Sequence, residues 1–346
     1  MNKLLIFYLT SNDRYFVFGK FIDEIKKMKN KEDVKILIVN SSNDLSFYDN
    51  ELRNSGLDYD LAGVECPQSN YLPKVRYAID YAKTNGYKYI MKFDNDVIVP
   101  AYTMDYIIQE CELLNDDSTL TLSPTISTGI PSVEYFIDDF FDPEYANEIR
   151  REFSRCVFQV QDGIMDYTPL NQHTVNSQEP WDYINYYRSI NSYMDGLTDI
   201  GNGRTINNYC KFYKGMHPVR HGFGNKLIND GIINNREKFF ASKDCKPIRA
   251  EYSTYLCDMC FVIRTDKYDK IINHENLIID GCDEVPINRF SWINNLNHII
   301  IRGGYAIHMT YNWRWYLNEV DGGSNIEKPE NSLDLYEMDF IKSLYE

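Results

Sequence analysis

The stretch Tyr-Ile-Met-Lys-Phe-Asp-Asn-Asp-Val-Ile-Val-Pro, residues 89–100, decides the fold. It begins as an apolar strand and then reaches two aspartates, Asp94 and Asp96, on either side of Asn95. Burying such carboxylates without partners would be costly, so we expect them to face a cleft and share a cation. Carboxylate oxygens suit a hard divalent ion, which also binds phosphate oxygens. A solvated Asp-Asn-Asp turn is the alternative, because this spacing is common by chance.

Strands alternate with helices before this motif. Near-continuous apolar runs, typical of parallel strands buried on both faces, predict strands at Leu4–Thr10, Val34–Val39 and Tyr89–Phe93, with a weaker one at Asp60–Val64. Helical spacing predicts helices at Tyr15–Met28 and Tyr71–Lys83. This rhythm predicts an α/β fold with a mixed, mostly parallel, twisted, Rossmann-like sheet flanked by helices. Ligands bind such sheets at the carboxyl ends of the strands.

The length of the chain predicts more than one structural part. Its 346 residues exceed the ~250–300 at which single cores usually stop growing. The βα rhythm covers residues 1–131 and regular patterns return at residues 250–346, where His298–Arg302 and Tyr305–Thr310 are expected to be separate strands. Residues 132–249 are polar and rich in aromatics, and we predict a largely helical insertion there.

Composition limits the partners. The chain has 51 acidic and 36 basic residues and a net charge of −15, so its surface repels phosphate backbones and disfavours nucleic acid. A local basic groove in the insertion would override this, formed by Arg150, Arg151, Arg155, Lys211, Lys214 and Arg220. No stretch approaches the ~20 apolar residues of a membrane span, and Leu4–Leu9 is too short for a signal-peptide core, so we expect a cytoplasmic protein without membrane insertion. The abundant asparagine and tyrosine point to an AT-rich genome, such as that of a virus or phage.

Two features near the end of the chain carry further chemistry. Asp283 and Glu284 precede a predicted helix over Ile287–Asn295. A carboxylate here is either a helix cap or a general base that takes the proton of an acceptor hydroxyl. His308 is either a hydrogen-bonded core histidine or a neutral ligand for a metal such as Mn²⁺.

The run from Leu4 to Pro100 resembles the nucleotide-binding half of GT-A glycosyltransferases, with Asp94-Asn95-Asp96 in place of their DxD motif. The resemblance returns from about residue 250 to 312. It implies that Asp96 ligates Mn²⁺ or Mg²⁺ held by the diphosphate of a nucleotide sugar, and that Asp94 contacts the ribose or metal-bound water beside it. It also favours His308 as a metal ligand and Asp283, more than Glu284, as the base of an inverting transfer.

Weaker donor-binding candidates follow from the same resemblance. Thr10 and Ser11 end the first strand, where the nucleotide base docks in this family. Lys74 lies on the helix before the DxD strand, where it would pair with a phosphate or the base; a surface lysine is the alternative. Asn95 lies between the two aspartates. Residues 1–131 then form the nucleotide-sugar-binding half, 132–249 the acceptor-side insertion, and 250–346 the acceptor-binding and C-terminal part.

The sequence therefore predicts a metal-dependent glycosyltransferase. It would move a sugar from a nucleotide-sugar donor, which we expect to be UDP-linked, to a hydroxyl on a glycan or other biopolymer. One alternative is a transferase acting on hydroxylated DNA bases of a virus or phage. Another is a nucleotidyltransferase, although the loop after the first strand, Ser11–Tyr15, lacks the glycines such enzymes use for triphosphate. The third is a non-catalytic nucleotide-sugar-binding protein.

Overall fold

The computed structural model describes residues 4–11, 14–67, 70–128, 132–154, 159–161, 164–166, 197–199, 205–207, 223–241, 244–250, 256, 259–274, 277–278, 281–309 and 332–346. The chain forms two compact units, one of Met1–Ser132 with Phe240–His308 and one of Val133–Phe239 with Met309–Glu346. This division places residues 309–346 with the middle of the chain, whereas the sequence pattern groups them with residues 250–308.

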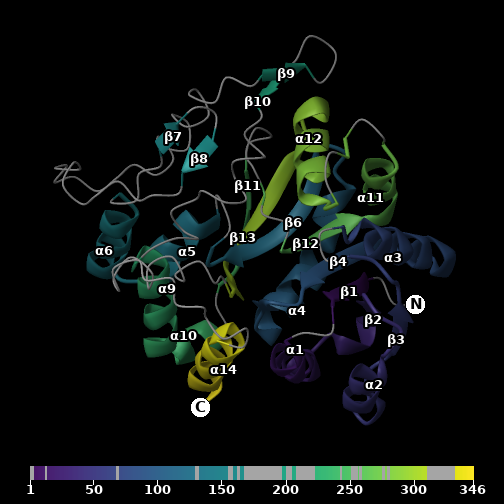
Figure 1. The fold of residues 1–346 in the computed structure, drawn as a ribbon, viewed down its shortest axis with the longest axis horizontal. Coiled ribbons are helices and arrows are strands. Elements are labelled where there is room, and N and C mark those ends of the chain that lie inside the picture. The colour runs from purple at the N-terminus through teal and green to yellow at the C-terminus, as the bar shows by residue number, and fades with distance from the viewer. Residues whose placement is uncertain are drawn as a thin grey trace. The chain divides into compact units, whose positions relative to one another are not determined.

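The first unit is built on a nine-stranded sheet with the order β11-β13-β6-β12-β4-β1-β2-β3, and β5 pairs with β13 (Figure 1). The strands are β1 (Leu4–Thr10), β2 (Val34–Asn40), β3 (Tyr59–Gly63), β4 (Tyr89–Asp94), β5 (Val97–Ile98), β6 (Thr119–Ile126), β11 (Lys246–Arg249), β12 (Cys260–Arg264) and β13 (Asn297–His308). Strands β1, β2, β3, β4, β6 and β13 share one direction, and β5, β11 and β12 run the other way. The predicted fold class, a mixed and mostly parallel sheet flanked by helices, is confirmed.

Helices cover both faces of this sheet, which explains why every residue of β1 and β2 is buried. Alternate residues of β1, such as Leu5 and Phe7, join a core cluster with side chains of α3, α11 and α12. On the other face Tyr8 packs on Phe21 of α1, with ring centroids 4.5 Å apart. The helices of this unit are α1 (Tyr15–Lys27), α2 (Ser46–Arg53), α3 (Leu72–Asn85), α4 (Ala101–Glu110), α11 (Thr265–Ile272) and α12 (Glu284–Asn294), with 3₁₀ helices at Lys31–Asp33 and Cys111–Asn115.

The connections create a topological switch point between β1 and β4. The chain moves outward from β1 to β2 and β3, and α3 then returns it to β4 on the opposite side of β1. Crevices at such points, outside the carboxyl ends of the strands, are where open α/β sheets bind ligands. The register pairs Leu9 of β1 with Asp94 of β4, so the DxD motif lies at the carboxyl ends of these strands, next to the switch point.

One prediction of local structure is wrong. The sequence predicts separate strands at His298–Arg302 and Tyr305–Thr310, with Gly303 and Gly304 as a turn between them, but residues 297–308 form the single strand β13. The pairing of β13 with β6 shifts register between Ile301 and Tyr305, and Gly303 adopts a φ of +76°. A glycine in the left-handed region lets the strand bulge and continue, so the chain does not reverse.

The second unit is mainly helical in its described part, in line with the predicted insertion. Helix α6 packs on α9, and the Tyr145 hydroxyl donates to the Leu227 carbonyl over 2.7 Å. Its elements are α5 (Ser132–Phe140), α6 (Pro143–Ser154), α9 (Phe223–Asn234), α10 (Arg236–Phe240), α14 (Ser332–Tyr345) and the hairpins β7 (Gln159–Gln161) with β8 (Ile164–Asp166) and β9 (Leu197–Asp199) with β10 (Thr205–Asn207). Across the described residues of both units, the helices lack the combined length and apolarity of a bilayer span.

Candidate active site

The structure brings Asp96 and His308 together. The turn after β4 leads into β5, and β5 pairs with the end of β13 so that Val97 lies opposite His308. Nε2 of His308 is 3.4 Å from Oδ2 of Asp96, and the two side chains are 11% and 15% exposed. The other ring nitrogen, Nδ1, lies 2.9 Å from the hydroxyl of Thr128. A hydrogen bond at this second nitrogen fixes the orientation of a ligating imidazole, so Thr128 directs Nε2 toward Asp96.

The surroundings keep Asp96 charged. Burial by itself raises the pKa of this carboxyl, but the charge interaction and hydrogen bond with His308 outweigh it. The guanidinium of Arg14 acts in the same direction, and together they lower the pKa of Asp96 from 3.8 to about 2. The Asp96 carboxyl is therefore ionised at any physiological pH.

These two residues fit a cation site that a bound ligand completes. An imidazole nitrogen and a carboxylate oxygen suit Mn²⁺ or Mg²⁺. Among the described residues, no group of three His, Cys, Asp or Glu side chains is placed to hold a metal. A cation between Asp96 and His308 would take its other ligands from an anion such as diphosphate and from water. One carboxylate oxygen of Asp94, Oδ1, lies 3.3 Å from Nζ of Lys92, so this oxygen is directed to the lysine.

Lys74 lies at the ends of β1 and β2. Its side chain is buried, so the alternative of a surface lysine is wrong. Nζ donates to the Thr10 carbonyl over 2.8 Å, to the Ser41 hydroxyl over 2.7 Å and to the Ser11 hydroxyl over 3.2 Å. The hydroxyl of Thr10 is 2.6 Å from that of Tyr48. The three predicted residues Thr10, Ser11 and Lys74 therefore form one hydrogen-bonded cluster at the carboxyl ends of β1 and β2.

Arg14 is a residue of this region that the sequence pattern does not single out. It immediately precedes α1 with a φ of +53°, in the left-handed region that non-glycine residues seldom adopt. Its Nη1 donates to Oδ1 of Asn95 over 3.4 Å. Its only sequence signal is a basic residue in the loop after the first strand. Backbone strain of this kind clusters at functional sites, and the guanidinium places positive charge beside the DxD turn.

The acidic pair at the start of α12 is buried. Oδ1 of Asp283 accepts from the Tyr71 hydroxyl over 2.8 Å and from Nζ of Lys92 over 2.9 Å, and Oδ2 accepts from the Tyr268 hydroxyl. Asp283 occupies the N-cap position but its side chain caps no backbone N–H, so the capping alternative is wrong for this side chain. The carboxylate has no exposed surface, so an acceptor would have to displace a donor to reach it. Glu284, the first residue of the helix, is 4% exposed.

Other predicted features fall outside this picture. Arg150 forms an ion pair with Asp138 over 2.6 Å in the second unit, which occupies one residue of the suggested basic groove. Four other residues of that groove, Arg155, Lys211, Lys214 and Arg220, lie outside the described residues. The aromatic residues around Trp181, which would either stack on acceptor sugars or form the core of the insertion, also lie outside them.

No protein-family model matches the chain, and no curated protein sequence matches it. Solved structures that resemble it include TarS from S. aureus in complex with UDP-GlcNAc, with 16% identity and a TM-score of 0.29 over 36% of this chain and 34% of that chain. The mannosyltransferase PcManGT from Pyrobaculum calidifontis, in complex with GDP-Man and Mn²⁺, matches with 15% identity and a TM-score of 0.30 over 36% of each chain. A cytidylyltransferase from Leptospira borgpetersenii matches with 12% identity and a TM-score of 0.30 over 70% of this chain and 99% of that chain.

The match thus spans about a third of the TarS chain compared, which is residues 1–349 of that protein, and about a third of the mannosyltransferase chain. Two of these three structures hold a nucleotide sugar, and the third is a nucleotidyltransferase. Likenesses at these TM-scores assign neither family nor activity, so the function is argued from the geometry of the site.

Proposed function

We propose that the protein is a metal-dependent glycosyltransferase that moves a sugar from a UDP-linked donor to a hydroxyl of a glycan or other biopolymer. The observation that carries the proposal is the Asp96–His308 pair, 3.4 Å apart, at the switch point of a mostly parallel sheet. The Lys74 cluster lies at the neighbouring strand ends. A donor across this crevice would place its nucleoside near β1 and β2 and its diphosphate at the DxD turn.

Each residue around the turn has a role in this scheme. Asp96 and His308 would hold Mn²⁺ or Mg²⁺, which neutralises the charge of a leaving diphosphate when bound. Arg14 adds positive charge on the same side, where charge develops in the transition state. Asp94 would reach the ribose or a metal-bound water, and Asn95 orients Arg14 through its side-chain oxygen.

The acidic pair would activate the acceptor. A hydroxyl is a poor nucleophile until a positioned base removes its proton, and attack from the face opposite the diphosphate inverts the anomeric carbon. We assign this base to the pair at the start of α12. Asp283 takes the proton if one of its three donors gives way, and Glu284 on the same helix turn is the alternative. Substituting each by its amide separates them, because only the base variant loses transfer while keeping donor binding.

A donor panel tests the proposal. The protein is incubated with UDP-, GDP-, CDP- and dTDP-sugars, with Mn²⁺ or with a chelator, and released nucleoside diphosphate is measured. We expect release from a UDP-sugar that requires the metal, and a loss of about 100-fold or more in Asp96→Asn. Asp266→Asn, on the surface of the same unit, is the matched control and should keep the activity of the unaltered protein. If no donor in the panel gives metal-dependent release, the proposal fails.

A further inference from the structure

Lys92 lies inside β4, two residues before Asp94. Because side chains alternate along a strand, Lys92 and Asp94 point to the same face of the sheet. The lysine side chain has no exposed surface, and its Nζ is 3.3 Å from Oδ1 of Asp94 and 2.9 Å from Oδ1 of Asp283. The ammonium therefore bridges the first aspartate of the motif and the acidic pair, which are far apart in sequence.

Aromatic residues enclose this bridge. Nζ lies 5.0 Å from the ring centroid of Tyr71 and 5.8 Å from that of Phe261, which is opposite Lys92 in the neighbouring strand β12. An ammonium buried among rings is favourable only when charged partners and hydrogen bonds replace its water. Here Asp94 and Asp283 are the charged partners, and Asp283 also accepts a hydrogen bond from Nζ.

The Tyr71 backbone extends the network to the nucleotide side. Its N–H donates to the Gly281 carbonyl over 2.9 Å, and its hydroxyl reaches Asp283. Tyr71 is the N-cap of α3, the helix whose first turn carries Lys74. One helix start thus contacts both the segment of the acidic pair and the ends of β1 and β2.

We propose that Lys92 is a positioning residue. Its ammonium holds the Asp94 carboxylate through one oxygen, so that Asp96 and His308, and not Asp94, bind the cation directly. The inference rests on the proposed function. Its physical basis is that the Lys92 ammonium lies 3.3 Å from Oδ1 of Asp94, whereas Oδ2 of Asp96 lies 3.4 Å from Nε2 of His308. The ammonium beside Asp94 would repel a cation at the turn, which favours binding at Asp96 and His308.

Binding of Mn²⁺ in the presence of UDP tests this, measured by the electron-paramagnetic-resonance signal of free Mn²⁺. Asp94→Asn should change the dissociation constant by less than about 3-fold, whereas Asp96→Asn should raise it by about 30-fold or more. Lys92→Met combined with Asp283→Asn removes both charges of the buried pair, so that neither is left uncompensated. In this double variant Asp94 is released, and Mn²⁺ should bind about 10-fold tighter. Adding Asp94→Asn should abolish that gain.

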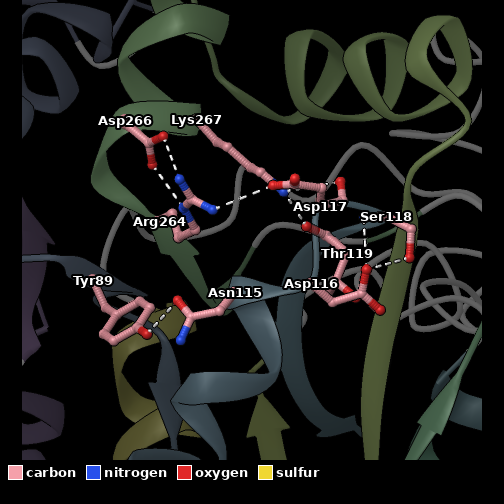
Figure 2. A network of polar contacts seen from close by, with 9 residues as sticks. All are labelled: Tyr89, Asn115, Asp116, Asp117, Ser118, Thr119, Arg264, Asp266 and Lys267. Atoms are coloured by element: carbon pink, nitrogen blue, oxygen red, sulfur yellow. Dashed lines mark hydrogen bonds and ion pairs between the residues drawn. The ribbon is translucent and has the colours of Figure 1, made fainter.

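Lys267→Met is the matched control. Lys267 is a buried lysine of the same unit that donates to the Thr119 carbonyl over 2.6 Å, within a polar network at the other end of β4 (Figure 2). The Lys267→Met variant should bind Mn²⁺ as tightly as the unaltered protein. Thermal unfolding of each variant separates a general loss of structure from a local change.

The outcomes are distinct. If Asp94→Asn weakens Mn²⁺ binding as much as Asp96→Asn, or the double variant binds as the unaltered protein does, the role of Lys92 is overturned and the proposed function stands. If the unaltered protein binds no Mn²⁺ with any nucleoside diphosphate, the proposed function fails, and the inference fails with it.

Discussion

The two ends of β4 use the same kinds of charged residues in opposite ways. Beyond the start of the strand, Arg264 pairs with Asp266 through two hydrogen bonds of 2.9 and 2.6 Å, and lies 3.7 Å from Asp117 (Figure 2). These two aspartate side chains are 51% and 98% exposed. At the other end, Lys92 and Asp283 are both fully buried.

This difference in burial indicates that the Arg264 network and the Lys92–Asp283 pair have different roles. Exposed ion pairs contribute about 0–1 kcal/mol, because water screens them. A buried pair gains little over apolar residues of the same shape, since desolvation offsets the attraction. A chain that needed only stability would have no reason to bury Lys92 and Asp283. Their position beside the DxD turn therefore supports a functional role, while the Arg264 network ties β12 and α11 to the loop before β6.

The largest expected effect comes from breaking the buried pair on one side only. Lys92→Met leaves Asp283 charged and enclosed, and should lower the free energy of unfolding by about 3–5 kcal/mol. Urea denaturation measures this. Adding Asp283→Asn should recover most of the loss, because no buried charge then remains. A single variant no less stable than the unaltered protein would remove the distinction between the two ends of β4.

The second effect concerns His308. Replacing it with alanine removes one of the two proposed protein ligands of the cation and should lower metal-dependent release of nucleoside diphosphate by about 100-fold. Thr128→Val, which removes only the contact to Nδ1, should cost about 10-fold, as is typical of groups that orient a metal ligand. Equal losses in the two variants, or none in either, would contradict the ligand role.

The third prediction concerns His298, whose burial, and not its position near the exposed network, determines its effect on stability. His298 lies one residue from Asn297, whose N–H donates to the Ser118 carbonyl near the exposed network, yet its ring is fully buried. Burial lowers the pKa of His298 from 6.5 to about 3. Between these two pH values His298 is protonated in the unfolded chain but neutral in the folded chain. The free energy of unfolding therefore rises with pH across this window.

On acidification from pH 6.5 toward pH 3, His298 should therefore cost up to about 1.4 kcal/mol of stability per pH unit. Denaturation at several pH values, compared between the unaltered protein and His298→Gln, isolates this contribution. His274→Gln, at an exposed histidine of the same unit, is the matched control. Parallel curves for the unaltered protein and His298→Gln would show that residue 298 is protonated in both states.

The sequence predicts some of these features and misses others for definable reasons. The strands β1, β2 and β4 follow from apolar runs, and the DxD motif from its place at a strand end. The role of Lys92 does not follow, because a lone lysine in an apolar strand shows no partner, and Asp283 lies 191 residues away. The sequence also leaves the position of the Lys74 side chain open, because helical spacing does not show that its ammonium reaches Thr10 and Ser41. Local sequence patterns determine where strands and helices form. The contacts of Lys92 and Lys74 depend on which strand ends, far apart in sequence, come together in the fold.

The smallest expected effect lies in the exposed network. Arg264→Met removes the paired hydrogen bonds to Asp266, and should lower stability by less than about 1 kcal/mol because both carboxylates remain hydrated. The loss should shrink further in high salt, which screens surface charges. Urea denaturation at low and high ionic strength measures both. If Arg264→Met instead costs as much as Lys92→Met and is insensitive to salt, the two ends of β4 do not differ as their burial indicates, and the argument that the buried pair is kept for function loses its basis.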